Sequence, residues 1–152
     1  MVVVAGILYR WSVDVSGEPE VALFRRKVGD MGAGLYEFPG GKVERGESES
    51  QALIRELDEE LNIRARVEEL LGETSFRGFS GRDIVLKVFF VTADLLPLQL
   101  REHDDYQWVS RSTLVEGGKH AFVTQNLSDG DRPLMTDCFL ALEKKQQKYL
   151  RK

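Results

Sequence analysis

The chain has 152 residues, of which 42% are hydrophobic and 30% are charged. It has enough apolar material for one core but not for two, so we expect a single domain over residues 1–152. The formal net charge of −4 argues against bulk nucleic-acid binding, which usually requires a basic domain. A small polyanionic substrate is still compatible with this charge, because a bound divalent cation can reverse the local field.

The single cysteine, Cys138, cannot form an intrachain disulfide, which fits a reducing cytoplasm. Its helical spacing from Met135 and Leu142 predicts a small core residue. No stretch approaches the ~18 consecutive apolar residues of a membrane helix, so we expect no membrane contact. The apolar start of the chain lacks the basic residues and the cleavage site of a signal peptide, and we expect a buried strand there.

The first half of the chain predicts three strands and one helix. Val2–Trp11 and Glu20–Arg26 are apolar runs separated by a turn-forming Ser-Gly-Glu-Pro sequence. The glycine-rich segment Val28–Gly34 predicts a loop, and Leu35–Phe38 predicts a short strand that ends at a proline. The apolar spacing becomes helical over Ser48–Leu61.

The second half predicts three more strands and a final helix. Val67–Arg77 and Ile84–Ala93 are strand candidates, and the second is nearly all apolar, as expected of a central strand. A short strand is predicted at Gln107–Val109. A proline, favoured at the first helical position, opens a helix predicted over Pro133–Tyr149. Strands and two helices around one core predict a mixed α/β layered domain.

The first predicted helix carries an unusual row of acids. Ser48 is a good N-cap, and Asn62 stands where the helix should stop. At ~100° per residue, Glu56, Glu59 and Glu60 fall on one narrow stripe, beside a stripe of three leucines that should be buried. Like charges at these spacings repel, and a hard cation such as Mg²⁺ would reverse that effect. The alternative is a solvated acidic face.

The residues that flank this row favour the cation. Glu47 adds a fourth acid just before the helix. Arg55 lies within the acidic cluster and can pair with one carboxylate while it leaves the others for metal. The pair Gly40–Gly41 supplies a backbone that can approach a ligand closely.

These residues together resemble the Nudix box, G-x5-E-x7-R-E-U-x-E-E-x-G-U, in which U is aliphatic. The chain supplies eight of the nine defined positions in register, namely Gly41, Glu47, Arg55, Glu56, Leu57, Glu59, Glu60 and Ile63. The one departure is Asn62 in place of glycine, and asparagine is the next most tolerant residue at a helix stop with positive φ. The preceding Glu-Phe-Pro-Gly-Gly-Lys sequence is similar to the MutT-like branch of the family.

The resemblance implies an α/β fold: an α/β/α sandwich with a mixed central sheet and a loop-helix-loop metal site. It also implies a Mg²⁺ cofactor, with Mn²⁺ as an alternative. The implied ligands are Glu56, Glu59 and Glu60 with the backbone carbonyl of Gly40. Glu47 would be an outer ligand or would orient Arg55. The implied reaction is attack of a metal-activated water on phosphorus.

Two glutamates are candidates for the general base. MutT-like enzymes can use a glutamate on a later loop, six residues before a tryptophan, and Glu102 and Trp108 have that spacing. Glu59, within the box, is the rival candidate. Glu102 would otherwise be an exposed loop acid. The adjacent His103 is expected to be structural or solvated rather than catalytic.

Three further residues match substrate contacts of MutT-like proteins. Arg26, at the end of a strand, and Lys42, beside the glycine pair, correspond to phosphate contacts. Asp131 lies just before the last helix, where an Asn or Asp reads the purine edge in the family. A carboxylate can accept from two guanine N–H donors. Equally, Asp131 can serve as the cap of the last helix.

The substrate class follows from which subfamily signatures the chain lacks. The residues from Arg64 to Leu96 include no proline or tyrosine, which the ADP-ribose and dinucleoside polyphosphate groups tend to have beyond the box. This elimination favours a nucleoside triphosphate pyrophosphohydrolase, with an oxidised guanine nucleotide as one candidate substrate. The resemblance to the family implies a monomer or homodimer. The alternatives are a nucleotide-sugar hydrolase, an RNA 5′-pyrophosphate hydrolase, and a ligand-binding regulator without activity.

Overall fold

A long first strand organises the sheet in this computed structural model, which describes residues 1–14, 16–94 and 98–151. The strands are β1 (Val2–Trp11), β2 (Pro19–Arg26), β3 (Tyr36–Glu37), β4 (Gly40–Lys42), β5 (Ala65–Arg77), β6 (Asp83–Ala93) and β7 (His103–Val109). Their order is β3-β2-β1-β6-β5, with β4 paired to β1 and β7 paired to β2. The β1–β6 pair is parallel and its neighbours are antiparallel, so the sheet is mixed.

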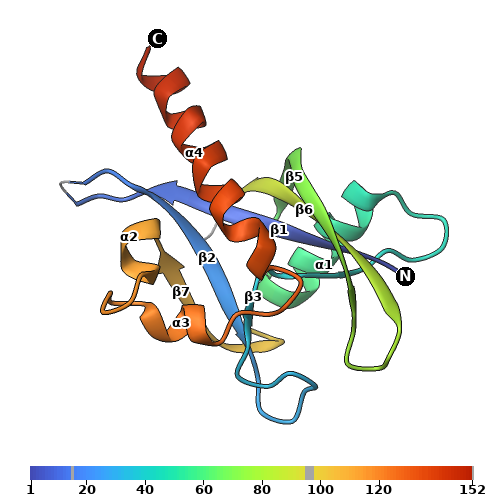
Figure 1. The fold of residues 1–152 in the computed structure, drawn as a ribbon. Helices are drawn as coiled ribbons and strands as arrows, with labels where there is room; N and C mark the ends of the chain where they lie inside the picture. Colours follow the sequence, from blue (N-terminus) through green and yellow to red (C-terminus); the bar gives the residue numbers. More distant parts are fainter. Residues whose placement is uncertain (15, 95–97, 152) are drawn as a thin grey trace.

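Helices cover both faces of this sheet (Figure 1). The helices are α1 (Glu49–Leu61), α2 (Arg111–Leu114), α3 (Ala121–Gln125), the 3-10 turn η1 (Arg132–Leu134) and α4 (Met135–Leu150). The buried side of α1 packs with one core cluster and the buried side of α4 with the other. The expected layered α/β architecture is therefore confirmed, and Cys138 is buried in the α4 cluster as predicted.

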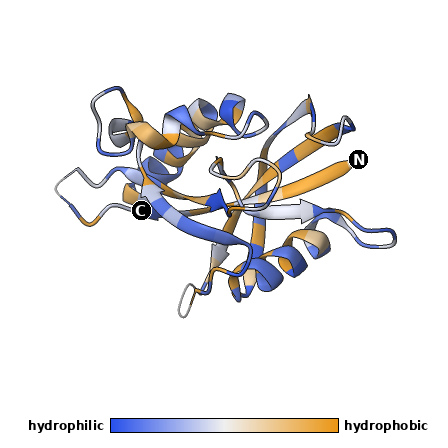
Figure 2. Ribbon diagram, turned by 90° about the horizontal axis from the view of Figure 1, so that it is seen from below, coloured by the Kyte–Doolittle hydropathy of each residue, from blue (hydrophilic) through white to orange (hydrophobic). Residues whose placement is uncertain are grey.

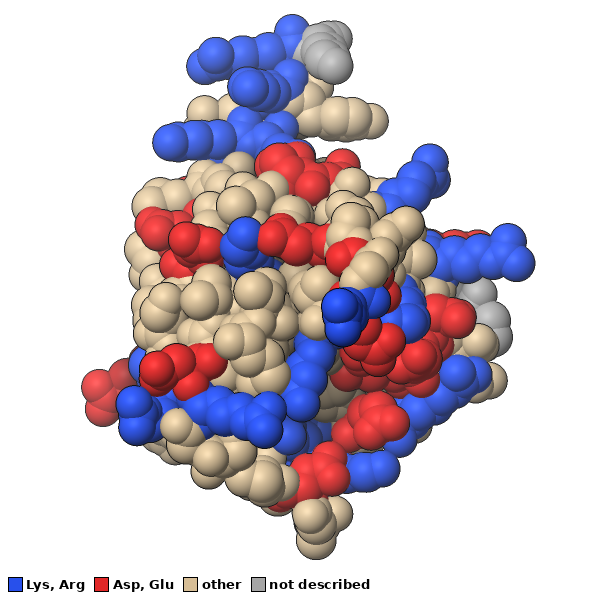
Figure 3. Space-filling model, turned by 90° about the vertical axis from the view of Figure 1, so that its right-hand side faces the viewer, with Lys and Arg blue, Asp and Glu red and all other residues tan. Residues whose placement is uncertain are grey.

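The surfaces of the helices follow from this packing. Hydrophobic residues concentrate along the strands, whereas α1 turns a hydrophilic face outward (Figure 2). The last turns of α4 project beyond the sheet, and basic side chains cover them (Figures 1 and 3). Within the described ranges, no helix is long and apolar enough to cross a membrane.

Helix α1 begins and ends as its sequence predicts. Ser48 caps it, because its Oγ accepts from the Gln51 N–H at 3.1 Å while the Gln51 side chain accepts from the Ser48 N–H at 2.8 Å. Asn62 adopts the left-handed conformation with φ 57°, and its N–H donates to the Asp58 carbonyl. These two caps fix which residues of α1 face the sheet.

Three features of the fold differ from the sequence predictions. Strand β4 and the short helices α2 and α3 were not predicted, and β7 begins at His103 rather than at Gln107. Asp104 and Asp105 are poor strand formers, but Arg25 and Tyr36 on the neighbouring strands bind their carboxylates at 2.6 Å each. Tertiary contacts therefore extend this strand, and Glu102 lies directly before it.

Candidate active site

The three glutamates of the acidic row occupy different environments. The Glu56 side chain is 17% exposed and that of Glu59 is 58% exposed. Glu60 is half-buried, and its Oε2 is buried without a hydrogen-bond partner among the described residues. The row thus turns from solvent toward the interior, and Glu60 is its innermost carboxylate.

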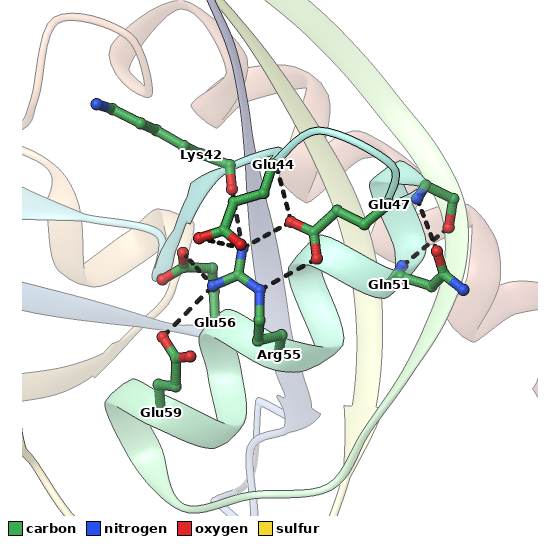
Figure 4. Close-up of polar contacts among 8 residues, drawn as sticks. Lys42, Glu44, Glu47, Gln51, Arg55, Glu56 and Glu59 are labelled. Atoms are coloured by element: carbon green, nitrogen blue, oxygen red, sulfur yellow. Dashed lines mark hydrogen bonds and ion pairs between the residues drawn. The ribbon is translucent and has the colours of Figure 1, made fainter.

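Arg55 ties most of the acidic cluster together (Figure 4). Its Nη2 and Nε bind the two oxygens of Glu47 at 2.7 and 3.1 Å, and its Nη1 contacts Glu56 at 2.9 Å and Glu59 at 3.4 Å. It also donates to the Lys42 carbonyl at 3.1 Å. The expectation that Arg55 pairs with one carboxylate is wrong, because the planar guanidinium reaches several acceptors at once.

Glu60 lies where four carboxylates converge. Burial and, to a smaller extent, the nearby charges of Glu37, Glu56 and Glu102 together raise its pKa to about 9, although a hydrogen bond from the Gly40 backbone acts in the opposite direction. These acids come from β3, from α1 and from the residue before β7. A cation would stabilise such a half-buried group of carboxylates, because their charges repel one another.

The glycines of β4 let the backbone pack closely against Glu56 and against β1. A Cβ on Gly41 would lie only 2.5 Å from Oε2 of Glu56, and a Cβ on Gly40 would overlap the Val4 carbonyl oxygen. No three acidic, histidine or cysteine side chains among residues 1–14, 16–94 and 98–151 are already arranged to hold one ion. Arg55 binds Glu47, Glu56 and Glu59 instead. The unpartnered Glu60 oxygen and the oxygen-rich donor set nevertheless fit a hard divalent cation.

Glu37 is the site residue that the sequence prediction missed. Its carboxylate accepts from Arg26 Nη1 at 3.3 and 3.4 Å, and its Oε1 lies 3.2 Å from His103 Nε2. It lies near enough to raise the pKa values of both Glu60 and Asp131. The one available signal was its position directly before the Phe-Pro-Gly-Gly sequence.

The two predicted phosphate contacts lie on either side of the acids. Arg26, at the end of β2, also donates from Nε to the Met31 carbonyl at 2.6 Å. The Lys42 side chain is exposed and extends away from the Arg55 cluster (Figure 4). On the face that Figure 3 draws, acidic side chains gather in a patch that lysine and arginine side chains border.

Asp131 is deeply buried and is not the cap of the last helix. A 3-10 turn intervenes, α4 takes Leu134 as its N-cap, and the Asp131 side chain makes no capping hydrogen bond. It is 3% exposed, and its Oδ1 has no partner among the residues that the structure describes. Burial, with a smaller effect of Glu37, holds its pKa well above the ordinary value.

Comparison with known protein families identifies the family of this chain. The model of the NUDIX domain matches residues 8–130. The chain belongs to the Nudix family, and it is a Nudix hydrolase. The MutT-like resemblance of its metal-site segment is thereby confirmed at the level of the family.

Named relatives of this Nudix hydrolase support the same placement. It is 37% identical over 140 residues to the CTP pyrophosphohydrolase of Escherichia coli (strain K12), covering 92% of this chain and 91% of that protein. It is 48% identical over 59 residues to the 8-oxo-dGTP diphosphatase of Proteus vulgaris, covering 39% of this chain and 52% of that protein.

Solved structures show the same Nudix fold. The solution structure of the E. coli ORF135 protein matches with a TM-score of 0.68 and 36% identity, over 93% of this chain and 89% of that one. The crystal structure of a MutT protein from Methanosarcina mazei Go1 also has a TM-score of 0.68, at 24% identity, over 96% and 94% of the two chains. The second likeness shows the fold alone.

Proposed function

We propose that this Nudix hydrolase cleaves a nucleoside triphosphate to a nucleoside monophosphate and pyrophosphate, with Mg²⁺ as its cation and Mn²⁺ as a substitute. The observation that carries the proposal is the convergence of Glu37, Glu56 and Glu102 on the half-buried Glu60. Such a carboxylate group suits a cation that bridges to substrate phosphates. The similarity to the CTP pyrophosphohydrolase of E. coli supports the triphosphate class.

In this proposal the α1 acids hold the cation. Glu56, Glu59 and Glu60 are the side-chain ligands, and the Gly40 carbonyl completes the set. When bound, the cation supplies Lewis-acid stabilisation of charge on the phosphates and lowers the pKa of water. Glu47 keeps Arg55 in place through two hydrogen bonds, so that Glu56 and Glu59 stay oriented between catalytic cycles.

We assign the general base to Glu102 rather than to Glu59. Glu102 is exposed and lies close enough to Glu60 to affect its pKa, whereas Glu59 contacts the Arg55 guanidinium. A carboxylate near the site that has no guanidinium partner among the described residues can accept a proton from water. The test is the turnover of Glu102→Gln with saturating Mg²⁺: kcat should fall by about a hundredfold or more, whereas near-normal turnover would transfer the role to Glu59.

The substrate contacts divide between phosphate and base. Arg26 and Lys42 are assigned to the phosphates, and Asp131 to the nucleobase. The unpartnered Asp131 Oδ1 is a buried polar atom that a base edge can satisfy. Because its pKa is raised, its carboxyl group can donate as well as accept a hydrogen bond.

The experiment is a substrate panel with purified protein and Mg²⁺, comparing kcat/KM for CTP, dCTP, 8-oxo-dGTP, a nucleotide sugar and triphosphorylated RNA. The proposal expects the highest value for a nucleoside triphosphate, with the monophosphate and pyrophosphate as products. A nucleotide sugar or RNA as the best substrate would overturn the substrate class. Hydrolysis of none of them would favour a ligand-binding regulator.

A further inference from the structure

His103 is a buried polar residue that the proposed roles do not use. It opens β7, is 6% exposed, and its ring lies 5.5 Å from the ring of Phe24. Its Nε2 lies 3.2 Å from the Glu37 carboxylate, whereas its Nδ1 is buried without a hydrogen-bond partner among the described residues. One ring nitrogen is therefore engaged and the other is not.

This imbalance is informative about what the histidine contributes. A carboxylate only accepts hydrogen bonds, so His103 Nε2 carries the proton and donates to Glu37. A buried polar atom without a partner is unfavourable, so an apolar side chain would pack beside Phe24 without that disadvantage. The feature that histidine adds at this position is the hydrogen bond to Glu37.

The strand pairing explains how this hydrogen bond arises. Arg26 of β2 is the register partner of His103 in β7, and a register shift interrupts the ladder between Arg25 and Arg26. Such an irregularity re-aims side chains. Here Arg26 and His103 both contact Glu37. The carboxylate is therefore held by two donors, one on each of the paired strands β2 and β7.

We propose that His103 is a positioning residue, which together with Arg26 fixes the Glu37 carboxylate at the edge of the proposed site. Glu37 lies near Glu60 and Asp131, which are assigned to the cation and to the nucleobase. The inference rests on the proposed function for its kinetic consequence only. Loss of the Nε2 donor lets Glu37 move, and the nucleotide then binds less well, although the α1 acids are unchanged.

The first test needs neither metal nor substrate. The chain has two histidines, so long-range ¹H–¹⁵N spectra of untagged, metal-free protein assign both rings, with His120→Gln identifying the other signals. We expect the Nε2-protonated tautomer for His103 and a shift of its Nε2 signal in Glu37→Gln. An Nδ1-protonated ring, or an Nε2 signal that ignores Glu37→Gln, would overturn the proposal.

The second test is a double-mutant cycle on the best nucleotide substrate. His103→Leu should raise KM at least about threefold, because Glu37 loses one of its two donors and no longer keeps its place, and should change kcat by less than about threefold. His103→Gln, which keeps a side-chain N–H, should restore most of the affinity. In a Glu37→Gln background, His103→Leu should have little further effect, because both changes remove the same interaction.

His120 provides the matched control. It is also 6% exposed and also makes one side-chain contact, from Nδ1 to Thr113 Oγ1 at 2.9 Å. His120→Leu and His103→Leu should lower the melting temperature comparably, but only the latter should raise KM. Equal effects on KM, or additivity with Glu37→Gln, would contradict the positioning role. If the wild type hydrolyses no nucleotide, the proposed function fails while the spectra still test the His103–Glu37 bond.

Discussion

The backbone of Gly41 in β4 lies directly against the carboxylate of Glu56 in α1. A methyl group at this glycine would come within 2.5 Å of Glu56 Oε2, so the absence of a side chain is what lets Glu56 stay where it is. This contact joins β4 to α1, which the sequence separates by a loop.

We predict that Gly41→Ala damages the site while it spares the fold. The atoms that meet the new methyl group are the far end of a flexible side chain, so the Glu56 carboxylate can move aside. The free energy of unfolding should fall by less than about 1 kcal/mol. The value of kcat/KM should fall about a hundredfold, because a displaced ligand no longer fits the transition state.

Gly40→Ala is the contrasting variant. Its methyl group would overlap the backbone oxygen of Val4, which cannot move without disturbing β1. We expect a loss of several kcal/mol of stability, measured by urea unfolding. Equal stability of the two variants would contradict this account of the glycine pair.

Glu59→Gln should lower kcat by several orders of magnitude, because it removes a charged group that the proposal places at the cation. Its fold should be little affected, since the change relieves repulsion along α1. Asp58→Asn is the matched control, because Asp58 is an exposed neighbour on the same helix to which no role is assigned. Near-normal turnover of Glu59→Gln, measured with saturating Mg²⁺, would count against the assigned site.

The raised pKa of Glu60 predicts how the stability of the metal-free protein depends on pH. Its pKa is about 9 in the folded protein against an ordinary value of 4.5. Between these values the folded state binds one more proton than the unfolded chain. The free energy of unfolding therefore falls as pH rises, by at most about 1.4 kcal/mol per pH unit.

Urea unfolding at pH 7 and pH 8.5 measures this effect. Wild-type protein should lose about 1–2 kcal/mol over this interval, and Glu60→Gln should lose clearly less. Some dependence should remain in the variant, because the pKa of Asp131 is raised as well. The same dependence in wild type and variant would show that Glu60 is ionised in the folded protein at pH 7.

Asn62 tests the one departure from the family motif. Its φ of 57° lies in the left-handed region, which glycine adopts without strain. We predict that Asn62→Gly changes the free energy of unfolding by less than about 0.5 kcal/mol, and that Asn62→Ala destabilises the protein by about 1 kcal/mol. Thermal unfolding distinguishes the two, and an equal loss in both would contradict the role of the backbone conformation.

The sequence was sufficient for the parts of the molecule that local patterns determine. The limits of α1 follow from Ser48 and Asn62, and its buried face follows from the spacing of its leucines. The acidic row was predicted for the same reason, since residues on one helix keep a fixed angular relation. The strands with long apolar runs, such as β1 and β6, were predicted almost to their ends.

The parts that the sequence did not predict depend on contacts between distant segments. Glu37 belongs to a strand of two residues, and its place beside Glu60 depends on how β3, β7 and α1 meet. The sequence predicted too short a β7, because aspartate is a poor strand former. In the structure its aspartates lie in the strand and bind Arg25 and Tyr36. The sequence likewise did not predict the 3-10 turn that separates Asp131 from α4.

The most direct test of the central claim is the anomalous diffraction of crystals soaked in Mn²⁺. The account predicts a peak bounded by the carboxylates of Glu56, Glu59 and Glu60 and the carbonyl of Gly40, with Arg55 no longer bound to Glu56 or Glu59. The account would be contradicted if the crystalline enzyme hydrolysed nucleotides while Mn²⁺ bound only elsewhere and Arg55 remained bound to Glu56 and Glu59.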